Sequence, residues 1–225
     1  MLPRYSFFSC LLFCLGLCCS SCSNRLTESV TYTRGISLIQ GALAYEPSFL
    51  PKPASPVTIS RAKALPKDKH GMPTYSDHSN RTRYVRTTAY SCMENEPGAW
   101  GSLTASGSTL KYGSVRSAAA DWSVYPLGTT FRVKGQPHTY IVEDYGSALA
   151  GTNTVDIYKP SLQKMKKWGT RFTEITVVEW GSYERSARIL KGRIRYDHCR
   201  KMYYGCMRKL NNSVVSNDIK RNGAL

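Results

Sequence analysis

The chain has 225 residues and carries 31 Lys and Arg against 15 Asp and Glu, a formal net charge of +16. This length predicts one domain of ordinary size with attachments, or at most two small domains. Residues 84–182 hold ten basic and eight acidic residues, whereas residues 183–225 hold eleven basic and only three acidic residues. A nucleic-acid module concentrates basic residues on its folded domain, so this distribution argues against nucleic acid as a partner.

Residues 1–22 have the pattern of an export signal. Arg4 precedes an apolar run from Phe7 to Leu17, and small residues and cysteines follow. The run is shorter than the about 20 apolar residues of a spanning helix. The segment resembles a bacterial lipoprotein signal, in which Cys18, Cys19 and Cys22 are all candidates for lipidation. Cys22 is the expected residue, because Ser20 and Ser21 place small residues just before it. The resemblance implies an exported, lipid-anchored protein of the bacterial cell envelope, on the periplasmic face of a membrane, with the outer membrane expected. A plain cleaved signal is the alternative.

Residues 23–83 are predicted to be a basic linker. They contain six prolines and many polar residues, without a sustained helical or strand period. Such a composition is typical of a segment that is partly disordered.

Residues 84–182 change to short β-rich runs separated by glycine and proline. In TFRVKG, Phe131 and Val133 alternate with basic residues, as in a half-buried strand. One short helix is predicted at 160–168. The other predicted strands are YVRTTAYSC, SVRSAAA, TYIVED, TVDIY and EITVVEW. About six strands with one small helix predict a mainly all-β domain that forms a closed or nearly closed barrel.

Residues 183–225 are predicted to be a basic tail, with a basic amphipathic helix as a further reading of its spacing. Cys199 and Cys206 could form a disulfide if the chain turns back at Gly205. On an unbroken helix, their seven-residue offset puts the Cα atoms about 10 Å apart, too far for a disulfide. Both basic flanks could contact anionic envelope polymers or could simply solvate the chain ends.

Two aspartates stand among apolar strand residues. In TVDIY, Asp156 faces away from Val155 and Ile157, whereas in TYIVED the alternation puts Asp144 on the side of Val142. A partly buried carboxyl group has a raised pKa, which a second carboxylate raises further, and this suits a general acid. The alternatives are structural: Asp121 could cap a turn, Asp144 could form an Asx turn, and Asp156 could face solvent.

Six pieces of this region stand in the order of the three-aspartate (3D) domain: TAY, TASG, AAADWSVYPLGT, VEDYGSALAG, TVDIY and WGTR. The region resembles that domain, a small six-stranded double-psi β-barrel shared with the murein lytic transglycosylase A family. The resemblance implies that Asp121, Asp144 and Asp156 are the three aspartates that name the domain.

The resemblance further implies cleavage of peptidoglycan glycan strands by lytic transglycosylation, which leaves 1,6-anhydro ends. In that reaction one carboxyl group acts as acid and then as base, whereas a hydrolase normally uses two carboxyl groups. Asp156 is then expected as the catalytic acid and base, Asp144 to raise its pKa and position it, and Asp121 to shape the site. No cofactor or metal is expected.

Hydroxyl groups and aromatic faces suit contacts with sugars, and Tyr90, Thr104, Ser106 and Tyr145 are the candidates. The loop EDYGSALAG departs from the usual EDTGGAIKG. Tyr145 replaces a threonine, Ser147 a glycine and Ala150 a lysine, and the last change removes a cation from the expected site.

Other readings stay open. The barrel is similar, more distantly, to that of the rare lipoprotein A family, which also acts on murein. A non-catalytic wall-binding barrel of the expansin kind, a two-carboxylate glycoside hydrolase, and a divalent-cation site made by the three carboxylates are the alternatives.

Overall fold

A computed structural model describes residues 50–94 and 101–222, with side chains as far as residue 213. The expected signal segment 1–22, its Cys22 and the first part of the expected linker lie outside the described residues.

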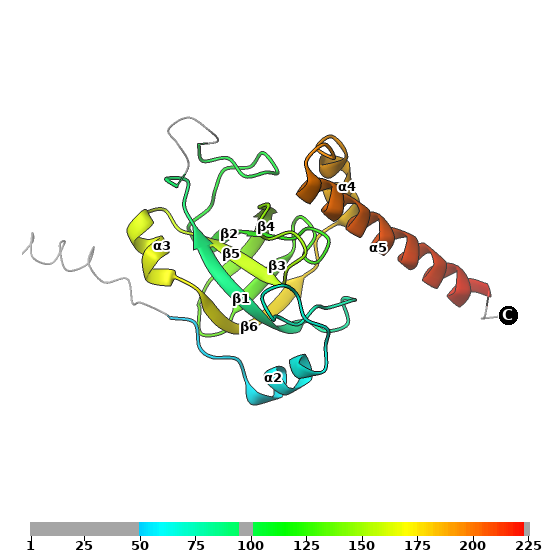
Figure 1. The fold of residues 1–225 in the computed structure, drawn as a ribbon, viewed down its shortest axis with the longest axis horizontal. Helices are drawn as coiled ribbons and strands as arrows, with labels where there is room; N and C mark the ends of the chain where they lie inside the picture. Colours follow the sequence, from blue (N-terminus) through cyan, green and yellow to red (C-terminus); the bar gives the residue numbers. More distant parts are fainter. Residues whose placement is uncertain (1–49, 95–100, 223–225) are drawn as a thin grey trace, which may run out of the picture. The chain divides into compact units, whose positions relative to one another are not determined.

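Six strands form one closed barrel, in the order β1, β5, β2, β4, β3, β6 (Figure 1). β1 pairs in parallel with β5, and β2 with β4, whereas the other four pairs are antiparallel. The strands are β1 Thr82–Tyr90, β2 Val115–Ala120, β3 Thr130–Val133, β4 Thr139–Asp144, β5 Thr154–Tyr158 and β6 Arg171–Glu179. The predicted mainly-β, closed six-stranded barrel is confirmed.

The barrel interior is filled by the inward residues of each strand. In β3, Phe131 and Val133 are buried while Arg132 is exposed, as the alternation predicts. Val155 and Ile157 of β5 are likewise fully buried. Because these side chains fill the interior, the polar residues between them must lie on the outer face of the strands.

One irregularity in the pairing of β2 with β4 decides where Asp144 lies. Ala118 pairs with Val142, but Ala119 pairs with Asp144, so Glu143 is an extra residue in β4. A bulge of this kind puts two residues of one strand opposite one of its partner and breaks the alternation. The prediction that Asp144 shares the side of Val142 is therefore wrong, because Asp144 is aligned with outward-facing Ala119.

The predicted short helix is α3, Leu162–Trp168. The Ser161 hydroxyl caps its first turn by accepting a hydrogen bond from the Lys164 amide, at 3.3 Å. Gly169 ends the helix with φ of 60°, in the region that only glycine adopts without strain.

Residues 50–81 of the expected linker pack on the barrel. Helix α2, Pro56–Lys63, begins after Ser55, whose amide and hydroxyl both donate to the Glu174 carboxylate of β6, at 3.0 and 2.8 Å. The Thr58 hydroxyl donates to the same carboxylate at 2.6 Å. The linker interpretation is corrected for this part, because hydrogen bonds from the barrel satisfy the polar groups of the proline-rich segment. The boundary expected at residue 84 thus lies inside the folded unit, which spans residues 49–225.

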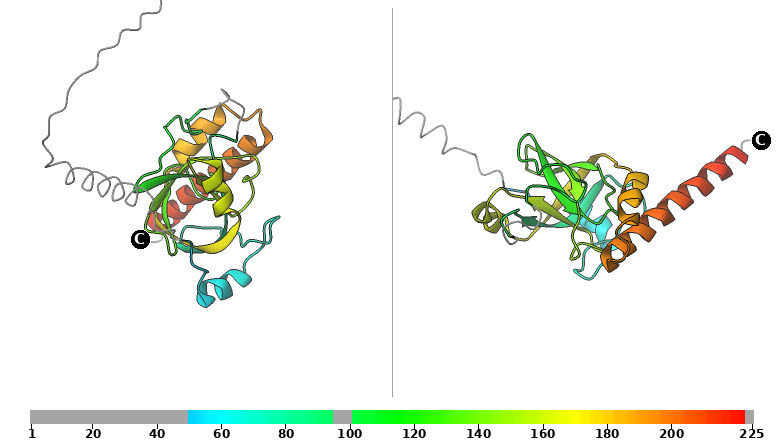
Figure 2. Two further views of the ribbon diagram at one scale, coloured as in Figure 1. Left: turned by 90° about the vertical axis from the view of Figure 1, so that its left-hand side faces the viewer. Right: turned by 90° about the horizontal axis from the view of Figure 1, so that it is seen from above.

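The expected tail forms two helices, α4 Tyr183–Lys191 and α5 Asp197–Asn222, which pack against each other. Leu190 of α4 and Met202 of α5 are fully buried in the barrel's hydrophobic cluster. Figure 2 shows that the second half of α5 extends away from the barrel. The boundary expected at residue 182 therefore also lies inside the folded unit. Among the described residues, no helix is long and apolar enough to cross a membrane.

Cys199 and Cys206 are both buried and both free. They lie on the same unbroken helix α5, so the predicted separation, too long for a disulfide, holds. Cys206 donates to the Trp122 carbonyl oxygen at 3.4 Å, which fixes α5 against the residues that follow β2.

Candidate functional site

Four residues on neighbouring strands form a lateral row, which we call the acidic row: Thr88, Asp156, Ala119 and Asp144. Asp156 pairs with Thr88 of β1 on one side and with Ala119 of β2 on the other. Ala119 in turn pairs with Asp144 of β4. Adjacent strands lie about 4.8 Å apart, so the Cα atoms of the two aspartates are roughly 10 Å apart. The residue between them, Ala119, is buried and has only a methyl group, so it places no polar or bulky side chain between the two carboxyl groups.

Asp156 is half-buried, and the Thr88 hydroxyl donates to its Oδ1 at 2.7 Å. Burial raises its pKa to about 6. The hydrogen bond from Thr88 and the charge of Arg86 oppose this rise, whereas the negative charges of Glu94 and Asp144 add to it. The carboxyl group can therefore carry a proton at mildly acidic pH, which a general acid requires.

Asp144 is also half-buried, and its Oδ1 accepts hydrogen bonds from the backbone amides of Ala105 and Tyr145, at 3.0 and 2.9 Å. Burial raises its pKa, while these two amides and the positive charge of Arg193 oppose the rise. Hydrogen bonds to a carboxylate favour its ionised form. Of the two acids, the environment of Asp144 provides more donors to hold a negative charge.

Tyr90 ends β1 two residues after Thr88, and its ring lies 5.7 Å from that of Tyr158. Its hydroxyl is buried and makes no well-formed hydrogen bond. It does interact with Asp144 and Asp156, whose charges raise the tyrosine pKa after the larger effect of burial. A neutral phenol beside two carboxyl groups is a donor that a ligand or a rotated carboxylate could use.

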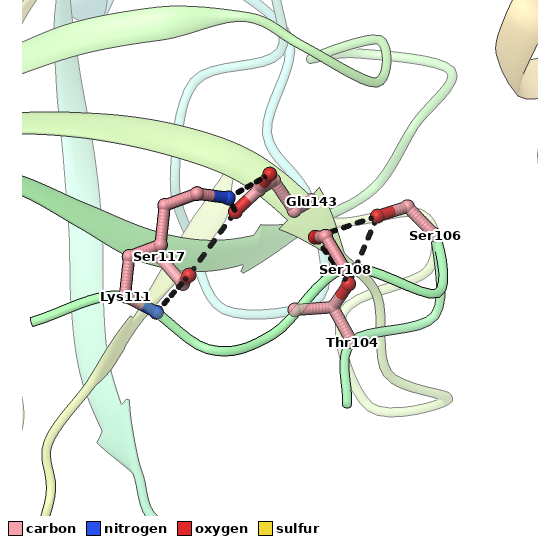
Figure 3. A network of polar contacts seen from close by, with 6 residues as sticks. All are labelled: Thr104, Ser106, Ser108, Lys111, Ser117 and Glu143. Atoms are coloured by element: carbon pink, nitrogen blue, oxygen red, sulfur yellow. Dashed lines mark hydrogen bonds and ion pairs between the residues drawn. The ribbon is translucent and has the colours of Figure 1, made fainter. Parts of the chain in front are cut away.

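The loop that carries Thr104 and Ser106 lies beside Asp144 through the Ala105 amide. The two hydroxyls hydrogen-bond to each other at 2.9 Å, and both bond to the hydroxyl of Ser108, at 3.0 and 3.1 Å (Figure 3). Each of the three hydroxyl groups thus finds its hydrogen-bond partners within the loop itself.

Glu143, the extra residue of the bulge, is held by contacts with β2 and with the segment that precedes β2. Its carboxylate forms an ion pair with Lys111 and accepts from the Ser117 hydroxyl at 3.2 Å (Figure 3). Its carbonyl oxygen accepts from the Ser106 amide at 3.1 Å. These contacts fix the bulge and, with it, the alignment of Asp144.

Asp121, the first aspartate of the expected set, is almost fully buried outside the acidic row. Its carboxylate accepts from the Ser123 amide and hydroxyl, at 2.7 and 2.6 Å, and from the Gly151 amide at 2.6 Å. Burial raises its pKa against these hydrogen bonds. It therefore ties the turn after β2 to the loop between β4 and β5, the loop that joins the other two aspartates.

Tyr145 follows Asp144 and is covered by the C-terminal helices. Its hydroxyl accepts from Arg193 Nη1 at 2.9 Å and from the Cys199 thiol at 3.3 Å. Its ring meets that of Trp122 edge-on, with centroids 5.0 Å apart. Although Ala150 stands where a lysine was expected, Arg193 supplies a cation beside this loop.

The structure brings together Asp156, Asp144 and Tyr90, and it places Thr104 and Ser106 next to them. Sequence reasoning did not single out Thr88, Glu94 or Arg193; of these, Thr88 lies in the TAY piece, so only this one carried a readable signal. Within the described part of the chain, no group of three or more His, Cys, Asp or Glu is arranged to hold a metal ion.

The family model of the 3D domain matches residues 116–179, a span that includes all three aspartates. No curated protein sequence matches the chain. The more distant resemblance to the rare lipoprotein A family stays a prediction. Over residues 116–179 the chain is therefore similar to the 3D domain, a domain that is also found in peptidoglycan-cleaving proteins.

Proposed function

We propose that this protein is a lytic transglycosylase that cleaves the glycan strands of peptidoglycan with Asp156 as its single acid and base. The observation that carries the proposal is the geometry of the acidic row, in which half-buried Asp156 is aligned with Asp144 across Ala119. Burial in this place raises the pKa of Asp156 to about 6. A carboxyl group with this pKa is protonated in part of the molecules near neutral pH, and its conjugate base accepts a proton readily.

The reaction uses that carboxyl group twice. Asp156 donates its proton to the glycosidic oxygen as the bond from the muramic anomeric carbon to that oxygen breaks. The muramic C6 hydroxyl then attacks the anomeric carbon, and the carboxylate of Asp156 takes the hydroxyl proton, so the group returns to its starting state. Asp144, held by two backbone amides, adds negative charge near the positive charge that develops on the sugar.

The test is digestion of purified murein by the full chain, with mass spectrometry of the released fragments. We expect 1,6-anhydro ends, and Asp156→Asn should abolish release while leaving the thermal unfolding transition in place. Asp197→Asn, which alters an exposed aspartate of α5 paired with Arg200 and Lys201, is the matched control and should keep full activity.

Two other outcomes would contradict the proposal. Reducing ends in place of anhydro ends would indicate a hydrolase, with Asp144 or Glu94 as the second carboxyl group. Binding of murein by wild type without any released fragment would indicate a non-catalytic wall-binding barrel.

The location of the protein is part of the proposal. Lipidation at Cys22 would hold it on the periplasmic face of a membrane, and its basic flanks would contact anionic envelope polymers. The exposed side chains of Arg188, Lys191 and Arg200 on the C-terminal helices support the second point. Labelling with a radioactive fatty acid tests the first, because Cys22→Ala should lose the label.

A further inference from the structure

We infer that Arg193, between α4 and α5, is a positioning residue for the acidic row. The inference deepens the proposed function and rests on it. Arg193 Nη1 donates to the Ala105 carbonyl oxygen at 3.0 Å and to the Tyr145 hydroxyl at 2.9 Å. One nitrogen atom thus joins two segments that are 40 residues apart in the chain.

The two residues that Arg193 joins are the two that hold Asp144. The backbone amides of Ala105 and Tyr145 both donate to Asp144 Oδ1. Arg193 therefore acts on the carboxylate through the segments that orient it, because its own side-chain hydrogen bonds go to Ala105 and Tyr145. Losing this link would free both donors to move away from Asp144, and small displacements of this kind reduce catalysis strongly.

Arg193 is itself held in place by the folded C-terminal helices. Its backbone amide donates to the Leu190 carbonyl oxygen at 2.8 Å, and Leu190 is fully buried. The Cys199 thiol of α5 donates to the same Tyr145 hydroxyl from a fully buried position. The guanidinium group therefore approaches the barrel from a rigid support, which gives it a defined direction.

The charge of Arg193 acts in the same direction as its hydrogen bonds. It opposes the raised pKa of Asp144, and ionised Asp144 in turn helps to raise the pKa of Asp156. The other titratable or charged groups that face these two acids are Tyr90 and Arg86 of β1 and Glu94 after β1. Without Arg193, the pKa of Asp144 should therefore rise.

The test compares Arg193→Gln with Arg195→Gln, a control that removes the same charge two residues away. Arg195 is exposed and its side chain contacts Tyr196, not the acidic row. Three measurements are made on each protein: an NMR titration of the carboxyl groups of Asp144 and Asp156, the pH profile of murein cleavage, and thermal unfolding.

In Arg193→Gln we expect the pKa of Asp144 to rise. The value of kcat/KM should fall roughly tenfold, from misplacement of Asp144. Arg195→Gln should match wild type in all of these. An unchanged pKa of Asp144 and an unchanged kcat/KM in Arg193→Gln, with only a lower unfolding temperature, would overturn the inference.

Arg193→Lys serves if the glutamine variant does not fold. Lysine keeps the charge but cannot reproduce the geometry of a planar guanidinium group. Both carboxyl pKa values should therefore stay near wild type while kcat/KM falls, and full activity in this variant would refute the positioning role. Because the titration needs no activity, a wild-type protein that releases no murein fragments would refute the proposed function and still leave Arg193 open to test.

Discussion

Replacing Thr88 by valine removes the hydroxyl that donates a 2.7 Å hydrogen bond to Asp156, while it keeps the shape of the side chain. This hydrogen bond opposes the raised pKa of Asp156, which is about 6 in wild type. A hydrogen bond to a charged group contributes about 1.5 kcal/mol at the lower end of its range, which applies to a half-buried acceptor. That energy corresponds to a pKa change of about 1, so the pKa of Asp156 should be higher by this amount in the variant.

The assay is the pH dependence of murein cleavage. A general acid must be protonated, so activity falls as pH rises through its pKa, and the high-pH edge should move upward in Thr88→Val. Thr87→Val is the matched control, because the Thr87 hydroxyl bonds to the Arg171 carbonyl oxygen on the other face of β1. An edge that stays in place or moves to lower pH in Thr88→Val would refute the assignment of Asp156 as the acid.

Two further predictions concern stability. Burial raises the pKa of Glu174, but hydrogen bonds from Thr58 and Ser55 outweigh this effect and lower the pKa. The ionised carboxylate therefore stabilises the fold at any pH above the unfolded pKa of about 4.5. This contribution is lost as the pH falls through the lower pKa of the folded state. Glu174→Gln should therefore reduce the free energy of unfolding by about 1 kcal/mol at neutral pH, and a denaturation series should show the difference vanishing in acid; a constant difference would argue against the linkage. Gly205→Ala should destabilise the protein by about 1 to 3 kcal/mol, because a methyl group at this position would collide with the Ser123 side chain. Gly192→Ala is the control, because its methyl group would meet only the Ile189 carbonyl oxygen, at 3.8 Å. Equal unfolding temperatures for the two alanine variants would contradict the close packing of α5.

The strands of the barrel could be predicted because each follows a local rule. β4 and β5 occupy the predicted TYIVED and TVDIY runs, since alternating apolar residues mark one buried face. The direction of Asp144 could not be predicted in the same way. It depends on the bulge at Glu143, and that bulge is fixed by Lys111 and Ser117, which are distant in sequence.

The packing of the proline-rich segment and of the C-terminal helices on the barrel could not be predicted from the sequence either. A proline-rich segment resembles a linker until its polar groups find partners, and here Glu174 provides them from β6. The C-terminal helices have a narrow apolar face, whose buried members Leu190 and Met202 are separated by the turn between α4 and α5. Arg193 lies in that turn, so its approach to Asp144 depends on tertiary packing alone.

The span matched by the family model is too short to be expressed as a folded fragment on its own. Residues 116–179 omit β1, which stands between β5 and β6 and closes the ring of strands. A fragment cut there would present two open strand edges, whose unpaired amides and carbonyls recruit other chains. Aggregated, inactive protein is the expected product of such a cut, whereas a fragment that begins before Lys52 and continues past Lys209 keeps the contacts of both chain ends with the rest of the fold.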